Sequence, residues 1–138
     1  MANPRAFISF DFDHNEGNRK YFVGQIYNSR TPFNVEDWSS KQELSQTQWE
    51  RILEEKINKC HLMIILVGRH MASANGVSKE IQMAIRNNVP IFGVYVDEAN
   101  TLSTLPASLS RTRVVPWNWV SIASMIDQCM KEGKNKTY

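Results

Sequence analysis

Leu62-Met63-Ile64-Ile65-Leu66-Val67 is an uninterrupted apolar run near the middle of the chain. A strand with one face in water alternates apolar and polar residues, so six apolar residues in succession predict a strand that is covered on both faces. Such strands lie at the centre of parallel sheets, because the connections between parallel strands place helices on both sides. The run is too short for a membrane span, which needs roughly 20 residues. It therefore predicts an α/β protein with a central strand at 62–67.

Strand and helix patterns alternate on both sides of this run. Apolar strand patterns lie at 5–10, 33–38, 91–96 and 112–117. Helical spacing of apolar residues predicts helices over 16–29, after a capping box at 45–48, over 76–87 and over 121–130. The buried faces are expected to carry Phe22, Ile26 and Tyr27; Trp49, Ile52, Leu53 and Ile57; Ile81, Ala84 and Ile85; and Ile122, Met125, Ile126 and Cys129.

This alternation predicts one doubly wound domain over residues 1–130, followed by a polar tail at 131–138. Strands that are joined through helices run parallel, and right-handed crossovers place helices on both faces of the sheet. We expect five strands in the order 2-1-3-4-5, as in flavodoxin-like folds. Ligands of such sheets bind beyond the carboxyl ends of the strands where the winding direction reverses, which here means strands 1 and 3.

Composition limits the classes of function. The 138 residues are 42% hydrophobic and 22% charged, which fits an ordinary folded domain and excludes a disordered chain. A net charge of +2 does not favour nucleic acid as a partner. The start of the chain lacks the apolar core of a signal peptide, so we expect a cytoplasmic protein with no membrane partner. Cys60 and Cys129 are then expected to be buried, reduced thiols, and no metal site is expected.

The turn after the first strand, Asp11-Phe12-Asp13-His14, is acidic. It offers no cradle for the phosphate of FMN, and Val67-Gly68-Arg69 lacks the aspartate that a response-regulator receiver phosphorylates after its third strand. An apolar strand that ends in Asp-x-Asp also opens Mg²⁺-dependent phosphohydrolases, in which the first carboxylate attacks phosphorus and the second moves a proton. Asp11 and Asp13 therefore leave a phosphohydrolase open, although one of them capping the next helix is the simpler interpretation.

Glu80 stands in the first turn of the helix that follows the central strand, within Asn75-Gly76-Val77-Ser78-Lys79-Glu80-Ile81. From there its carboxylate is expected to point over the sheet towards Ser9 and Phe10. A single carboxylate without a histidine, serine or cysteine partner suits charge stabilisation better than strong base catalysis. Cleavage of an N-glycosidic bond with a cationic leaving group is such a reaction, because its transition state resembles a ribosyl oxocarbenium ion.

Phe7-Ile8-Ser9-Phe10 with its acidic continuation, together with 76–81 after the third strand, resembles the TIR domain superfamily over about residues 5–130. Within it, the chain is similar to bacterial TIR-like domains of the ThsB kind from the Thoeris anti-phage system. The resemblance implies an enzyme of the NAD glycohydrolase and cyclase type, with NAD as substrate and no resident cofactor. A cyclic ADP-ribose type of signal would then act on a downstream effector, and the chain would self-associate on activation.

The same resemblance assigns roles to individual residues. It implies that Glu80 is catalytic and that the substrate is bound by Ser9, Phe10, Asp11, Asp37 and Trp38. Many TIR enzymes carry a tryptophan four residues before the catalytic glutamate, and this chain has Gly76 there. Trp49, Trp117 and Trp119 are interpreted as packing residues. Receptor TIR domains act by association alone, so a non-catalytic adaptor module is the alternative, and Glu80 would then be dispensable.

Overall fold

The structure is a computed structural model that describes residues 5–10, 17, 36–37, 46–69 and 75–132. Its centre is a parallel sheet with the strand order β2-β1-β3-β4-β5. The strands are β1 (Arg5–Ser9), β2 (Glu36–Asp37), β3 (Leu62–Val67), β4 (Ile91–Tyr95) and β5 (Val114–Val115). The two edge strands have two residues each, whereas the three inner strands form the main body of the sheet. The predicted α/β class with a parallel sheet is confirmed.

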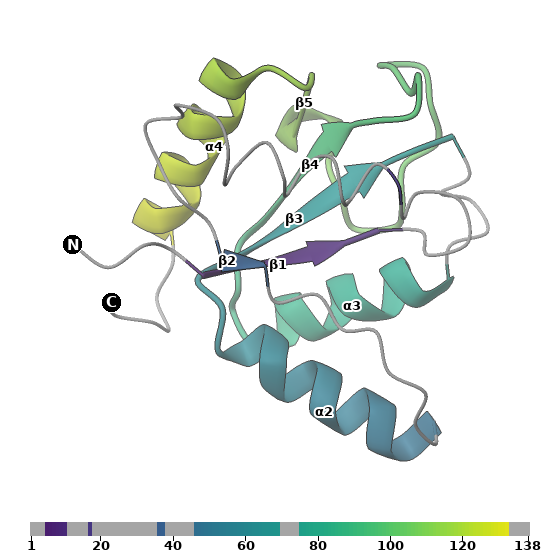
Figure 1. The fold of residues 1–138 in the computed structure, drawn as a ribbon, viewed down its shortest axis with the longest axis vertical. Coiled ribbons are helices and arrows are strands. Elements are labelled where there is room, and N and C mark those ends of the chain that lie inside the picture. The colour runs from purple at the N-terminus through teal and green to yellow at the C-terminus, as the bar shows by residue number, and fades with distance from the viewer. Residues whose placement is uncertain (1–4, 11–16, 18–35, 38–45, 70–74, 133–138) are drawn as a thin grey trace.

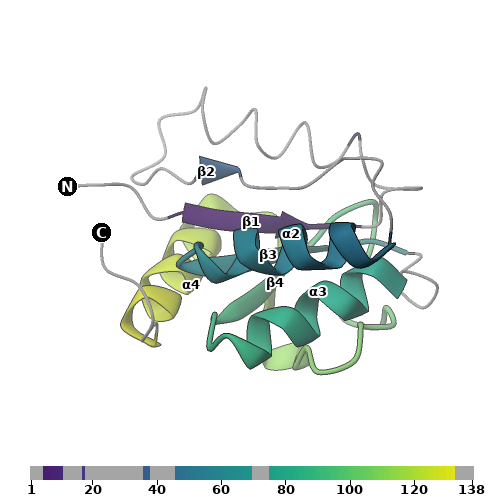
Figure 2. The same cartoon turned by 90° about the horizontal axis from the view of Figure 1, so that it is seen from below.

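Helices cover both faces of this sheet (Figure 1). They are α2 (Gln46–Asn58), α3 (Asn75–Arg86) and α4 (Trp119–Glu132), and a short 3-10 turn, η2 (Arg111–Arg113), precedes β5. Helices α2 and α3 lie side by side on one face, as the view from below shows, and α4 lies on the other (Figure 2). Side-chain ion pairs from Lys79 to Glu50 and from Arg86 to Glu54 join the two neighbouring helices.

β3 is the central strand, as its apolar sequence predicts. All six of its residues are fully buried, and it pairs with β1 on one side and with β4 on the other. Because successive side chains of a strand point to opposite faces, β3 contributes to two separate cores. Met63, Ile65 and Val67 join the cluster beneath α2 and α3, and the alternate residues join the cluster beneath α4.

Helix α4 packs through the stripe that the sequence predicts. Ile122, Met125, Ile126 and Cys129 are its buried residues. Trp117 and Trp119 are partly buried against the same cluster, which confirms their interpretation as packing residues. Cys60 and Cys129 are buried, also as expected, and they form no disulfide with a described residue. The helix continues to Glu132, so the first two residues of the expected tail are helical.

Two predictions about buried and extended residues are wrong. Ile85 is 47% exposed, because it stands in the last turn of α3 and lines a surface cavity at the end of the sheet instead of the core. The strand expected over 112–117 is reduced to Val114–Val115. The preceding residues form η2, in which the hydroxyl of Ser110 accepts a hydrogen bond from the Thr112 amide, and Pro116 cannot donate a further hydrogen bond to the sheet.

Some expectations fall on parts of the chain outside the described residues. These are the helix at 16–29 apart from Gly17, the strand at 33–38 apart from Glu36–Asp37, the capping residue Ser45 and the side chain of Trp49. Across the described ranges, no helix is both long and apolar enough to span a bilayer.

Candidate functional site

The side chains of Ser9 and Glu80 meet at the carboxyl end of β1. The Ser9 hydroxyl donates a hydrogen bond to Oε1 of Glu80 over 2.7 Å, although the two residues are 71 positions apart in the chain. Ser9 is the last residue of β1 and pairs in register with Ile65 of β3. The contact therefore lies at the switch point between strands 1 and 3, where the topology predicts a ligand site.

The packing of β1 and of α3 brings these two side chains together. Phe7 and Ser9 project to the same face of β1, two residues apart, and Phe7 belongs to the core beneath α2 and α3. Val77 and Ile81 of α3 are buried in that same core. Glu80 follows Val77 by three positions, so both side chains lie on neighbouring parts of the helix surface, and the carboxylate is brought over the end of β1. Because five residues of α3 precede it, Glu80 stands in the second turn of the helix, so the predicted place in the first turn is wrong.

The environment of Glu80 disfavours its charged form. The residue keeps some exposed surface, but its carboxyl group is enclosed by protein. Desolvation by this burial raises the pKa of Glu80 from an ordinary 4.5 to about 8, and the hydrogen bond from Ser9 opposes the shift. The carboxyl group is therefore largely protonated at neutral pH in the absence of ligand. A strongly raised carboxyl pKa at a sheet switch point is typical of functional sites.

The other residues expected at the site are distributed differently. Phe10 is partly buried and packs against the core beneath α4, on the opposite face of the sheet from Glu80. The main chain of Asp37 pairs with Ala6, three residues before Ser9, and its side chain lies outside the described set. Asp11 and Trp38 also lie outside it. Their roles in substrate binding stay predictions.

Gly76 leaves open space one helical turn before Glu80. The glycine is exposed, and a Cβ atom added to it would meet no atom of the described residues within 4 Å.

Metal chemistry finds no support in the described part of the chain. There, no group of three or more His, Cys, Asp or Glu side chains is arranged to hold a metal ion. Asp11 and Asp13, on which the phosphohydrolase hypothesis depends, are outside the described residues. Asp97, which follows β4, accepts a hydrogen bond from Arg69 over 3.1 Å and is thus paired with a cation.

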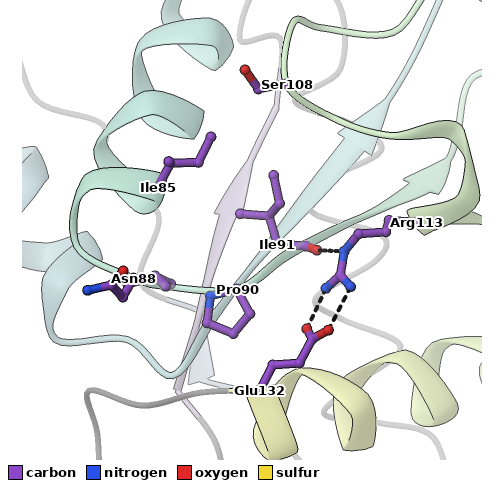
Figure 3. Close-up of a pocket in the computed structure, with 8 residues that line it drawn as sticks. Ile85, Asn88, Pro90, Ile91, Ser108, Arg113 and Glu132 are labelled. Atoms are coloured by element: carbon purple, nitrogen blue, oxygen red, sulfur yellow. Dashed lines mark hydrogen bonds and ion pairs between the residues drawn. The ribbon is translucent and has the colours of Figure 1, made fainter.

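A cavity of about 370 Å³ lies at the opposite end of the sheet, around the first residue of β4 (Figure 3). Arg113 forms two hydrogen bonds to the Glu132 carboxylate, over 2.8 and 3.0 Å, and a third to the main-chain carbonyl of Ile91. Since these contacts occupy the guanidinium group, the cavity does not present a free cation to an anionic ligand. The carboxyl end of the sheet is the better candidate site.

A parallel sheet of this order, with helices on both faces, places the chain in the fold class shared by flavodoxin-like and TIR-like domains. A crystal structure of a prokaryotic SEFIR domain, which is TIR-like, has the same fold with a TM-score of 0.50 and 14% sequence identity. The similarity covers 94% of this chain and 92% of the SEFIR chain.

The sequence comparison identifies the family within that class. Residues 7–101 match the family described as Thoeris protein ThsB, TIR-like domain. The chain belongs to this family and thus to the TIR-like proteins of Thoeris anti-phage defence. A search of curated proteins found no match.

Proposed function

We propose that this protein cleaves the bond between nicotinamide and ribose in NAD, with Glu80 as its catalytic residue. The observation that carries the proposal is the desolvated carboxyl group of Glu80, held by Ser9 at the switch point of the sheet. Membership of the ThsB family supports the same activity. NAD is the substrate, and the reaction needs no resident cofactor.

The chemistry follows from the charges of the substrate. When the bond between the ribose C1′ and the nicotinamide nitrogen breaks, its electron pair stays on the nitrogen and neutralises the pyridinium ring. The ribosyl group then carries the positive charge as an oxocarbenium-like species, which a nearby carboxylate stabilises. Water, or a hydroxyl of the same nucleotide, forms the new bond at C1′ and loses one proton. Hydrolysis and cyclisation share the first step and differ in which nucleophile is nearer to C1′.

The carboxyl group of Glu80 must be ionised for this role, and the charge of the bound substrate favours that ionisation. An opposite charge within about 4–6 Å favours the charged form of a carboxyl group. The pyridinium ring of bound NAD would therefore lower the pKa of Glu80, so that the carboxyl group releases its proton when the substrate enters. Ser9 assists, because its hydroxyl donates to Glu80 and favours the carboxylate over the acid. In this proposal Ser9 is a positioning residue for Glu80.

The wider role that we propose is that of a signal-producing enzyme. In Thoeris defence, a cyclic ADP-ribose type of product would leave the protein and activate a downstream effector. Self-association on activation would complete the site, and the reaction would use cytoplasmic NAD. Two buried cysteines that form no disulfide with a described residue are compatible with a reducing compartment.

The direct test compares nicotinamide release by the wild-type protein and by Glu80→Gln, measured chromatographically from NAD. Glutamine keeps the size of the side chain and can still accept the Ser9 hydrogen bond, but it cannot become negative. We expect a loss of at least about a hundredfold, in line with the removal of one electrostatic group from an active site. Glu55→Gln, which changes an exposed glutamate on α2, is the matched control and should retain full activity.

Equal release of nicotinamide by the wild type and by Glu80→Gln would refute the proposal. If the purified wild type is silent, the same two proteins are compared in infected cells, with mass spectrometry of the products from NAD. A non-catalytic adaptor would give the opposite result in that experiment. Glu80→Gln would leave its defence response intact, whereas changes to the exposed helix faces would abolish the response.

A further inference from the structure

A second cavity lies at the same edge of the sheet as Ser9, beyond the carboxyl ends of β4 and β5. Its volume is about 480 Å³, within the range of small-molecule sites. Its walls are the end of β4, the loop that follows it and the residues after β5: Tyr95, Val96, Asp97, Glu98, Ala99, Asn100, Thr101, Pro116 and Trp117.

The chemistry of the lining favours a flat, uncharged ligand that donates hydrogen bonds. Trp117 and Tyr95 provide two aromatic rings, and Glu98 provides a carboxylate, while the carboxylate of Asp97 is paired with Arg69. The lining, which consists entirely of described residues, contains no lysine, arginine or histidine of its own, so it offers no cation dedicated to a phosphate group. The Tyr95 hydroxyl is buried and has no hydrogen-bond partner among the described residues.

The loop is held in shape before any ligand arrives. The Ala99 amide donates to the carbonyl of Val96 over 2.9 Å, and the two residues between them, Asp97 and Glu98, have φ angles of 51° and 60°. Two successive left-handed residues closed by such a hydrogen bond form a type I′ turn. Further along, Arg111 donates to the carbonyl oxygens of two loop residues. A preorganised loop loses little entropy on binding.

The cavity also lies at a suitable distance from Glu80. Tyr95 is two strands away from Ser9 in the sheet and, by the register, two residues further along. With strands about 4.8 Å apart and a rise of about 3.3 Å per residue, the two Cα atoms are separated by about 12 Å. This separation is comparable with the length of an extended, pyrophosphate-linked dinucleotide. Ser9 and Tyr95 also project to the same face of the sheet, towards α3.

We propose that this cavity binds a nucleobase, the adenine of the dinucleotide whose ribosyl end is cleaved at Glu80. The proposal rests on the proposed function for the identity of the whole ligand. Adenine stacks against Trp117, and its exocyclic amine donates to the carboxylate of Glu98. The pyrophosphate lies outside the acidic cavity, in the direction of Ser9.

The test is a titration of the ¹⁵N-labelled protein with adenosine and, separately, with nicotinamide mononucleotide, followed by two-dimensional NMR. We expect adenosine to shift the indole signal of Trp117 and the amides of Asn100 and Thr101, and nicotinamide mononucleotide to leave them unchanged. Trp117→Leu should weaken adenosine binding by about tenfold, because stacking on an aromatic ring contributes about that much per base. Because Trp117 also packs against the core, Glu98→Gln at an exposed position serves as the second variant, with an expected weakening of about threefold.

Activity measurements distinguish a failure of the adenine site from a failure of the proposed reaction. Glu98→Gln should raise the KM for NAD and leave nicotinamide release at saturation unchanged, whereas Glu80→Gln abolishes release. If NAD is cleaved in a Glu80-dependent way but adenosine shifts no signal of the cavity, the adenine site is refuted and the enzyme remains. Shifts of the cavity signals by nicotinamide mononucleotide alone would refute it as well. If adenosine binds as expected but NAD is not cleaved, the base site stands and the proposed reaction fails.

Discussion

The raised pKa of Glu80 makes the stability of the folded protein depend on pH. In the unfolded chain the carboxyl group ionises at its ordinary pKa of 4.5, and in the folded protein it keeps its proton until about pH 8. Below pH 4.5 both states are protonated, so burial carries no charge penalty there. Between these two values the unfolded state binds fewer protons than the folded state, and the free energy of unfolding falls as the pH rises.

The magnitude follows from the interval between the two pKa values. It spans about 3.5 pH units at about 1.4 kcal/mol each, which gives a ceiling of about 5 kcal/mol above pH 8. Because Glu80 keeps some exposed surface, water relieves part of this penalty, and we expect about 2–4 kcal/mol. Such a change is a large fraction of the roughly 5–15 kcal/mol that stabilises a typical domain.

Glu80→Gln isolates this contribution, since glutamine imitates the protonated side chain at every pH. Urea unfolding, followed by tryptophan fluorescence from pH 4.5 to pH 9, measures the free energy of unfolding of both proteins. The two should agree within about 1 kcal/mol at pH 4.5, and the variant should become the more stable one as the pH rises towards 8. Glu55→Gln, at an exposed position on α2, should change stability by less than about 0.5 kcal/mol. A difference between wild type and Glu80→Gln that stays constant with pH would contradict the raised pKa of Glu80, and so would a wild type that gains stability relative to the variant.

Three further predictions concern single contacts. Ser9→Ala removes the hydrogen bond that favours the carboxylate, so the pKa of Glu80 should rise further above about 8. A carbon-detected NMR titration measures this pKa, and a fall would contradict the assigned contact. Gly93→Ala should destabilise the protein by about 1–3 kcal/mol in urea unfolding, because the added Cβ would lie 3.0 to 3.2 Å from three apolar side chains; a neutral effect would mean that they yield freely. Arg113→Ala should lower the free energy of unfolding by about 1–3 kcal/mol, because Arg113 bonds both Glu132 and the carbonyl at the start of β4. Glu132→Ala removes only the ion pair and should lower it by less than about 1 kcal/mol. Equal losses in these two variants would show that the carbonyl contact contributes nothing.

Local patterns determined the inner elements of the fold. Six apolar residues at 62–67 can be buried only in a strand that is covered on both faces, and that strand is β3. The stripe of α4 follows from the helical period in the same way, because the four residues that repeat at that period are the buried ones. The alternation of such elements also placed Glu80 near the end of β1, since the topology brings the start of α3 to the switch point.

Tertiary structure decided the features that depend on contacts between distant segments. Periodicity does not show where a helix leaves the sheet, so Ile85 follows the buried pattern and is nevertheless exposed. The sequence predicted that Glu80 points towards Ser9, 71 positions away, but the enclosure of its carboxyl group and its raised pKa depend on the packing of α3 against β1. The cavity between the loops after β4 and β5 likewise exists only once these two strands lie side by side. Desolvation and enclosure come from all neighbouring atoms in space, which is why no stretch of sequence contains them by itself.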